Sequence, residues 1–476
     1  MAEFVILRGF IKIPISRDAK TPDYKYSVVM GVRRISTLFY NSKDVHFHYS
    51  NGTVIILPSK ARKERANKSL VSGTEMYDPK NTDSRSKRYW LTNLYRRSVV
   101  SVERVFTLVV ELGPMHRVYA SPDRYIQGPG ALERVGPLAL QHGKSALIIS
   151  DSDVWQVVGD SVEESFNDVT TTMERSNFTG ECSTSEIDRL TDVASKRNAD
   201  VIIGIGGGKA IDTAKAVCGR TGEVVGSVPT VASTDAPTSS LSIIYTEEGT
   251  FERAHRHDFH PSFVVVDTNV VAHAPTRWFI SGIGDALATW FEAKATWENE
   301  GRTIHGARPT YASKAIARYS YDLLRENAED AVHAVNEDTV TESVEAVTEA
   351  TILLSGLGFE NGGTAAAHAV HDGLTTLSGI SDATHGEKVA VGVLVQLILE
   401  AYPKEEIKDI ISFADAVGLP VSLRDIDSID PTREELLRVG HVACDSEGSM
   451  GNEGIDVTPE DVANALQTLD SINESE

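Results

Sequence analysis

Cysteine is scarce in this sequence, with only three residues among 476, at Cys182, Cys218 and Cys444. Cysteines so few and so scattered exclude a disulfide framework or a zinc–thiolate cluster, and they favour a reducing compartment. Long apolar runs are missing as well. The longest, at 389–399, is interrupted by Gly392 and is shorter than the ~20 residues that a membrane span needs. We therefore expect a cytoplasmic protein that has no membrane partner.

Lysine becomes rare after residue 114. Residues 115–476 contain nine lysines and carry a net charge of −32, whereas residues 1–114 carry +10. An acidic surface that is poor in lysine is typical of halophilic proteins, whose carboxylates keep them hydrated in strong salt. An ordinary acidic enzyme would show the same sign of charge. We expect a halophilic protein.

The first 114 residues show neither a helical period nor a strand period, and they include the basic stretch KARKERANKS at 60–69. One interpretation is a nucleic-acid-binding arm, which would make the chain a nucleic-acid-binding protein. The interpretation that we favour is a translated upstream region before a start at Met115, because the opposite charge of the two parts suggests separate origins. We expect an irregular, poorly ordered extension and no nucleic-acid partner.

Regular patterns begin at Met115. Helical spacing between short apolar runs predicts βαβ units and a mainly parallel sheet. The runs lie at 144–150, 199–204, 224–228, 242–246 and 262–267. After about residue 273 only helical periodicity remains, in eight segments that include 340–356. The predicted fold is a Rossmann-like α/β domain at 115–273, followed by an all-α domain at 274–476.

A glycine cluster, Gly206 to Gly208, stands between a predicted strand and a predicted helix. Glycines let the backbone approach a pyrophosphate, and the start of a helix supplies N–H groups and a positive dipole end. The pattern completes neither the dinucleotide fingerprint nor the Walker loop, so a simple tight turn remains open. Asp151, at the end of a predicted strand, could accept hydrogen bonds from a ribose and would favour NAD over NADP. It could equally be a solvent-exposed acid.

Three histidines suggest a metal site in the helical part. His368 and His371 share one face of a helix, and His385 begins the next helix. Two imidazoles and a carboxylate make a catalytic metal site, and Asp285, on an otherwise apolar helix face, is the best candidate for the carboxylate. Each histidine could instead be structural, and Asp285 could be a first-turn acid. A second cluster, HRHDFH at 255–260, is interpreted as solvated loop.

Five motifs in this order resemble the glycerol dehydrogenases of the iron-containing alcohol dehydrogenase and dehydroquinate synthase-like superfamily. They are GIGGGKAIDTAKA, PTVASTDAPTSSLSIIY, SGIGDALATWFEAK, LLSGLGFENGGTAAAHAVHDGL and THGEKVAVG. The similarity runs from about Tyr125 to the end of the chain and leaves residues 1–114 outside it. It implies an NAD-binding α/β domain, a helical metal-binding domain and an active site in the cleft between them.

The resemblance also assigns roles to individual residues. It implies a metal held by Asp285, His368 and His385, with His371 beside the site, where it could relay a proton. The carboxylate that contacts substrate matches Asp235. Contacts to NAD are implied at the adenosine ribose, the pyrophosphate and the nicotinamide side. The matching residues are Asp151 for the ribose, Gly206, Gly207, Gly208 and Lys209 for the pyrophosphate, and Thr230, Ser233, Ser239, Leu241 and Tyr245 for the nicotinamide side.

One position distinguishes between metals. Iron-dependent members of the superfamily carry a further histidine four residues after the aspartate, where this chain has Thr289. A three-ligand site suits Zn²⁺, which keeps its fourth position for a substrate oxygen. The implied reaction is oxidation of glycerol to dihydroxyacetone, in which zinc lowers the pKa of the C2 hydroxyl and a hydride passes from C2 to NAD. A related polyol or glycerol 1-phosphate dehydrogenase is the alternative, and the resemblance implies a homo-oligomer.

Overall fold

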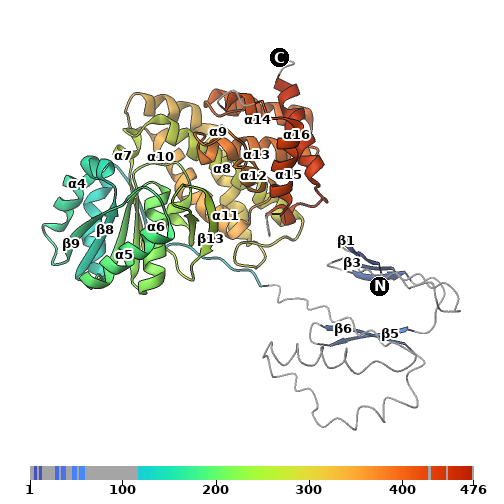
Figure 1. Cartoon of the computed structure of the whole chain (residues 1–476), viewed down its shortest axis with the longest axis horizontal. Coiled ribbons are helices and arrows are strands. Elements are labelled where there is room, and N and C mark those ends of the chain that lie inside the picture. Colours follow the sequence, from blue (N-terminus) through green and yellow to red (C-terminus); the bar gives the residue numbers. More distant parts are fainter. Residues whose placement is uncertain are drawn as a thin grey trace, which may run out of the picture. The chain divides into compact units, whose positions relative to one another are not determined.

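The computed structural model describes residues 116–426, 430–445 and 449–473, together with the backbone of six short strands before residue 59. Residues 1–115 and 116–476 form two separate compact units. In the first unit, β1 to β4 form an antiparallel sheet, and β5 and β6 form a hairpin (Figure 1). These strands are β1 (Val5–Leu7), β2 (Phe10–Lys12), β3 (Ser27–Gly31), β4 (Arg34–Leu38), β5 (Val45–Ser50) and β6 (Thr53–Pro58). These strands were not expected, because the sequence predicted an irregular extension without a strand period. Its poor order stays a prediction, and its basic stretch at 60–69 lies outside the described residues.

The second unit opens with a six-stranded parallel sheet, in the order β7–β14–β11–β10–β8–β9 (Figure 1). Its strands are β7 (Tyr125–Gly128), β8 (Ser145–Ser150), β9 (Thr172–Asn177), β10 (Val201–Gly206), β11 (Val224–Pro229) and β14 (Phe263–Asp267). Four of them fall on predicted runs. The other two, β7 and β9, form the edges of the sheet and are too polar to stand out as apolar runs. The fifth predicted run is β12 (Leu241–Tyr245), which pairs with β13 (Phe251–Arg256) in a separate hairpin.

Side-chain alternation along the central strands supports a layer of helices on each face of the sheet. In β8, Ile148 packs in a core with α3 and α4, whereas Leu147 and Ile149 pack with α5 and α6. A strand that is buried on both faces is apolar at nearly every position, which explains the unbroken run in this strand. The helices are α3 (Val135–His142), α4 (Ser152–Phe166), α5 (Thr184–Arg197) and α6 (Gly208–Thr221).

Helices make up all the regular structure described after Thr276, and their large shared core confirms the α/β-then-helical fold (Figure 1). They are α8 (Thr276–Glu298), α9 (Tyr311–Asn336), α10 (Glu342–Glu349), α11 (Ser355–Gly362), α12 (Ala366–Leu374), α13 (His385–Leu399), α14 (Lys404–Ala416), α15 (Arg433–Asp445) and α16 (Pro459–Asn473), with α7 (Thr268–Ala272) before them. The predicted helix at 340–356 is part of a longer one, in which a π-helical segment, Ala350–Leu354, joins α10 to α11. The boundary between 273 and 274 stays a prediction. Among the described helices, none combines the length and the apolar character that crossing a membrane requires.

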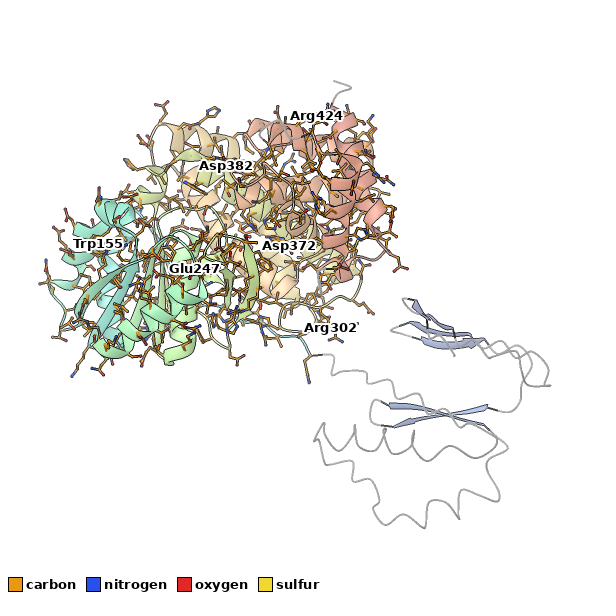
Figure 2. The ribbon with its side chains drawn as sticks, viewed as in Figure 1. Trp155, Glu247, Arg302, Asp372, Asp382 and Arg424 are labelled. Atoms are coloured by element: carbon orange, nitrogen blue, oxygen red, sulfur yellow. The ribbon has the colours of Figure 1, made fainter. Side chains whose placement is uncertain are left out.

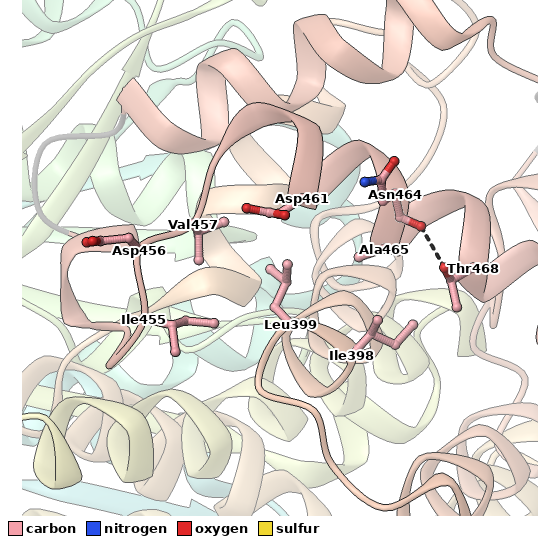
Figure 3. Close-up of a pocket in the computed structure, with 9 residues that line it drawn as sticks. All are labelled: Ile398, Leu399, Ile455, Asp456, Val457, Asp461, Asn464, Ala465 and Thr468. Atoms are coloured by element: carbon pink, nitrogen blue, oxygen red, sulfur yellow. Dashed lines mark hydrogen bonds between the residues drawn. The ribbon is translucent and has the colours of Figure 1, made fainter.

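A surface pocket of about 370 Å³ lies where the end of α13 meets α16 (Figure 3). Its lining includes the apolar side chains of Leu399 and Ile455 and the carboxylate of Asp461. None of the predicted site residues contributes to this pocket. The predicted metal ligands lie elsewhere, where α8, α12 and α13 meet.

Candidate active site

The three predicted metal ligands come from three helices and meet in space. Asp285 lies in α8, His368 in α12 and His385 at the first position of α13, and their ligand atoms all lie within 4.8 Å of one another. Asp285 Oδ1 is 3.1 Å from His385 Nε2 and 3.4 Å from His368 Nε2. A tetrahedral zinc ion places its ligand atoms about 3.3 Å apart. Asp285 Oδ1 therefore lies at the distance from both imidazoles that one shared ion requires, and these three residues are here called the metal cluster.

Close packing of α8 against α13 brings the acid and a histidine of the metal cluster together. A Cβ atom on Gly386 would lie 1.7 Å from the Ser281 carbonyl oxygen, and one on Gly284 would lie 2.4 Å from the Gly386 carbonyl oxygen. Gly386 also donates its N–H to Ser281 Oγ at 3.1 Å. Side chains larger than hydrogen at these two glycines would push the helices apart, so the glycines set the distance between Asp285 and His385.

The start of α13 is fixed by side chains on both sides of His385. Thr384 and Glu387 form a capping box, in which each side chain accepts a hydrogen bond from the other residue's backbone N–H. Arg277 from α8 binds both carboxylate oxygens of Glu387 at 2.8 Å. The helix α13 therefore begins at His385 and is tied to the helix that carries Asp285.

Glu292 orients His368. Its Oε2 lies 2.6 Å from His368 Nδ1, and its Oε1 accepts hydrogen bonds from the backbone N–H groups of Ala365 and His368, at 2.8 and 2.9 Å. The hydrogen bond to Glu292 keeps a proton on Nδ1. When the ring is neutral, Nε2, which faces Asp285, is then the nitrogen that can bind a metal. The sequence analysis missed Glu292. Its signal was an acid seven residues after Asp285, on the same face of the same helix.

His371 lies beside the metal cluster. Its Nε2 is 3.0 Å from His385 Nδ1, and its Nδ1 is 3.1 Å from Asp372 Oδ1. Burial, followed by the proximity of His385, lowers the pKa of His371 to about 3. The neutral ring can accept from His385 Nδ1–H while it donates to Asp372, which leaves His385 Nε2 with a free lone pair. The chain of hydrogen bonds ends at Asp372, a half-exposed side chain near the meeting of the α/β and helical parts (Figure 2).

The charges of the metal cluster oppose the effect of burial. Burial alone would raise the pKa of Asp285, but His385 and His368 outweigh it and hold that pKa below its ordinary value. Burial would likewise lower the pKa of His368, yet Glu292 and Asp285 raise it well above its ordinary value. The site is thus a fully buried carboxylate that attracts positive charge, as a metal-binding acid must.

Asp235 touches the metal cluster from the sheet side. Its backbone N–H donates to Asp285 Oδ2 at 3.2 Å, and its own Oδ2 accepts from Ser355 Oγ at 2.7 Å. Burial, and then the charge of Asp285, raise the pKa of Asp235. Ser355 Oγ also lies 2.8 Å from Thr289 Oγ1. The residue at the position of the iron enzymes' extra histidine therefore supports Ser355 and lies outside the metal cluster.

The predicted pyrophosphate residues form a cradle at the end of β10 (Gly206, Gly207 and Gly208). Gly206 has φ +147°, which favours glycine, and Gly207 caps the N-terminus of α6. A Cβ on Gly207 or Gly208 would meet its nearest atoms only at 3.7 and 3.5 Å, so packing within the chain does not require glycine at either position. Bare backbone at a helix N-terminus suits an anionic ligand. Lys209 follows, paired with Glu181 and 5.2 Å from the centre of the Tyr245 ring.

Asp151 lies at the same edge of the sheet as the glycine cradle, because β8 and β10 are adjacent parallel strands. Its Oδ1 caps α4 by accepting from the N–H groups of Asp153 and Val154, at 2.9 and 2.8 Å. The sequence analysis allowed a ribose contact or an exposed acid. The structure adds a helix cap, which engages one carboxylate oxygen.

The predicted nicotinamide-side residues follow β11 and connect the glycine cradle to the metal cluster. Thr230 donates its N–H to the Gly206 carbonyl oxygen at 3.1 Å. The Ser233 carbonyl oxygen accepts from Ser281 Oγ of α8 at 3.2 Å. Both residues are buried. The remaining members lie further along the same segment: Ser239 is buried, and Leu241 and Tyr245 begin and end β12.

The interpretation of residues 255–260 as solvated loop is wrong for two of its histidines. His257 is buried, with its Nε2 2.9 Å from Ser242 Oγ. His260 Nε2 lies 2.9 Å from Glu360 Oε2, and Glu360 is fully buried in α11. Polar composition suggested solvent, but each of these rings has a buried polar partner: Ser242 lies 15 residues before His257, and Glu360 lies 100 residues after His260.

The model of the family described as iron-containing alcohol dehydrogenase matches residues 122–268. The chain is 46% identical to glycolaldehyde reductase of Halobacterium salinarum, over 75% of this chain and 98% of that protein. It is 43% identical to glycerol dehydrogenase of Pseudomonas putida, over 76% of this chain and 99% of that protein.

Solved structures agree with the sequence relatives. A probable glycerol dehydrogenase from Sinorhizobium meliloti superposes with a TM-score of 0.72 at 39% identity, covering 76% of this chain and all of that one. Glycerol dehydrogenase from Schizosaccharomyces pombe gives a TM-score of 0.73 at 37% identity, covering 76% of this chain and 92% of that one. The chain belongs to the iron-containing alcohol dehydrogenase family. The resemblance to glycerol dehydrogenases that the sequence predicted is confirmed.

Proposed function

We propose that this chain oxidises glycerol to dihydroxyacetone, with NAD as hydride acceptor and a metal ion held by Asp285, His368 and His385. The observation that carries the proposal is the metal cluster, whose three ligand atoms lie within 4.8 Å of one another. The segment after β11 links it to the glycine cradle. Support comes also from the relatives named glycerol dehydrogenase, which match at 40–43% identity over most of their length.

The residues around the metal cluster suit alcohol oxidation. A divalent metal supplies positive charge that lowers the pKa of the substrate's C2 hydroxyl. Asp235, whose carboxylate Ser355 fixes, is placed to accept a hydrogen bond from another hydroxyl of the substrate. His371 and Asp372 form a hydrogen-bonded path along which the released proton can leave the buried site. NAD, held at the glycine cradle, would accept the hydride from C2.

We propose zinc as the metal. Two imidazole nitrogens and one carboxylate oxygen form the open three-ligand set of catalytic zinc sites. Thr289 is fully buried and bonded to Ser355, so it supports the site without adding a ligand. Held by these three residues, the ion would act on a substrate oxygen as a Lewis acid.

The proposed NAD contacts follow the edge of the sheet. The glycine cradle and Lys209 would hold the pyrophosphate, with the α6 N-terminus directed at it. Asp151 would accept from the adenosine ribose through the carboxylate that also caps α4. The nicotinamide side would be lined by the five residues already described on the segment that follows β11: Thr230, Ser233, Ser239, Leu241 and Tyr245.

A second candidate is reduction of glycolaldehyde by NADH, the same hydride transfer in the opposite direction. It is favoured by the relative named glycolaldehyde reductase, which is 46% identical over 98% of its length. Both substrates carry oxygens on adjacent carbons, so the same metal cluster could take either. Catalytic rates measured on glycerol and on glycolaldehyde distinguish the two candidate functions.

The test is glycerol-dependent reduction of NAD before chelation, after chelation, and after zinc is restored. We expect activity, its loss and its recovery in that order. The same preparation is then assayed with glycolaldehyde and NADH, with other diols and glycerol 1-phosphate, and with NADP. A higher kcat/KM for glycolaldehyde would favour the second candidate. Activity that survives complete metal removal would contradict both.

The proposal extends to the oligomeric state, the domain division and the cellular location of the protein. We propose a homo-oligomer and a division into an NAD-binding domain at 115–273 and a metal-binding domain at 274–476. A cytoplasmic location is supported by the three cysteines, all of which are free thiols. Sedimentation of the purified protein tests whether it is a homo-oligomer.

A further inference from the structure

Lys215 is among the large, fully buried side chains of the chain's described part, although lysine is rarely buried. It lies in α6, six residues after Lys209, and none of the roles proposed above uses it. Its Nζ forms an ion pair with Asp212 Oδ1 at 2.8 Å. The ammonium also donates to the Ala236 carbonyl oxygen at 2.9 Å and approaches the Ser239 carbonyl and hydroxyl oxygens at 3.4 Å.

These contacts hold residues 235–243, here called the strap, from the side of the sheet. Asp212 Oδ2 accepts from the N–H of Ile243 at 2.9 Å, near the strap's far end. Lys215 holds its first turn, which carries Asp235 and Ser239. One buried ion pair thus fixes the strap at both ends. Most of the strap atoms that Lys215 and Asp212 bind are backbone atoms, so the ion pair fixes the course of the strap's backbone.

The helical part holds the opposite side of the strap. Thr238 Oγ1 donates to the Ile352 carbonyl oxygen in the π-helical segment at 2.8 Å. Ser240 donates its N–H to Glu360 at 3.2 Å. Asp235 donates its N–H to Asp285 of the metal cluster. The strap therefore joins the helix that begins at the glycine cradle to the residue that holds the metal.

We propose that Lys215, paired with Asp212, is a positioning residue that fixes the strap and thereby sets the nicotinamide ring at the correct distance from the metal cluster. The inference rests on the proposed NAD-dependent reaction. Hydride transfer is sensitive to such placement, since a misplacement of about 1 Å can cost about 100-fold in rate. A charged amine binds several carbonyl oxygens at once, which no apolar side chain of the same length can do.

The experiment compares a charge-free variant with the parent enzyme. Lys215→Met alone would leave Asp212 buried and unpaired, which is strongly destabilising. The variant is therefore Asp212→Asn combined with Lys215→Met, which keeps an amide oxygen for the Ile243 N–H and removes both charges of the ion pair. Lys294→Met is the control, because the Lys294 ammonium bonds Tyr402 Oη at 2.6 Å, outside the strap. Thermal unfolding and metal content confirm that each variant folds and loads metal.

Two ligands separate positioning from general damage. ADP-ribose has the adenosine and pyrophosphate of NAD but lacks the nicotinamide. For the double variant we expect an unchanged Kd for ADP-ribose, a Kd for NADH about tenfold higher, and a kcat for glycerol about 10- to 100-fold lower. The control should match the parent in all three.

The inference is overturned if the folded double variant keeps the parent's NADH affinity and kcat. It is also overturned if ADP-ribose and NADH weaken equally, since that result would place the defect in the glycine cradle. Failure of the proposed function is a separate result. If the parent oxidises no polyol, the two binding measurements still show whether Lys215 positions the nicotinamide.

Discussion

At the scale of single residues, the metal cluster depends on the groups behind its ligands. The hydrogen bond from His368 Nδ1 to Glu292, at 2.6 Å, sets the tautomer that presents Nε2 toward Asp285. The hydrogen bond from His385 Nδ1 to His371 does the same for the other ring. Each histidine is thus held by one nitrogen and available through the other, which is how proteins tune metal-binding imidazoles.

Glu292→Gln should weaken metal binding by about 10- to 100-fold, because loss of the carboxylate charge makes His368 a poorer ligand. The measurement is zinc affinity by competition with a chelator. Asp372→Asn is the control, since His371 separates Asp372 from the metal cluster, and its zinc affinity should be unchanged. An unchanged affinity for Glu292→Gln would show that Glu292 does not tune the ligand.

The sequence could propose three metal ligands but could not predict the residues that support them. Asp285, His368 and His385 came from the resemblance to a family, and the structure brings their ligand atoms together. By spacing alone, His368 and His371 were the natural pair, yet it is His385 that approaches Asp285. Glu292 and Lys215 were overlooked because a buried charge has meaning only through its partners. Apart from Asp212, which lies three residues before Lys215, those partners lie 21 to 76 residues away.

At the scale of elements, the contact between α8 and α13 depends on glycine. Gly386→Ala should lower the free energy of unfolding by about 1–3 kcal/mol, because a Cβ there would lie 1.7 Å from the Ser281 carbonyl oxygen. It should also weaken zinc binding, because His385 would move away from Asp285. Gly451→Ala is the matched control, since its Cβ would meet no atom within 4 Å. Urea unfolding of both variants checks the prediction, and equal stabilities would contradict it.

The hydrogen bond between His260 and the buried Glu360 carboxylate should make the free energy of unfolding depend on pH. Burial would raise the pKa of Glu360, but hydrogen bonds from His260 and Ser240 outweigh it and lower the pKa. The carboxylate therefore stabilises the fold above the unfolded pKa of about 4.3, and this contribution is lost as pH falls through the lower folded pKa. Glu360→Gln should cost about 1–3 kcal/mol at pH 7, and its difference from the parent should shrink in acid. Urea unfolding at several pH values tests this, and a constant difference would refute it.

Elements were predictable from the sequence wherever periodicity was strong. The buried strands β8, β10, β11 and β14 and the long helices fall where apolar spacing placed them. The edge strand β9, TMERSN, escaped because its polar residues carry no apolar run. The hairpin strand β13 escaped because all six of its residues are exposed. Burial creates the signal, so exposed strands remain hidden from a single sequence.

At the scale of the whole molecule, the net charge indicates the salt concentration at which the protein should be most stable. Residues 115–476 carry −32, so self-repulsion should destabilise the fold in dilute buffer, where screening is weak. We expect both activity and the thermal midpoint to rise as KCl increases from dilute to molar concentrations. Sodium sulfate at matched ionic strength separates screening from general salting-out. Full activity and stability in dilute buffer would contradict a halophilic character.

The first 114 residues differ from the remainder in charge, and they lie in a compact unit of their own. All the proposed ligands, the glycine cradle and the strap lie within residues 116–473. A chain beginning at Met115 should therefore keep the parent's zinc content, thermal midpoint and kcat. Binding of duplex DNA, titrated with salt, should be absent from both chains. Loss of metal or fold on truncation would show that the extension is needed. DNA binding by the full chain alone would assign the extension the function of a nucleic-acid arm.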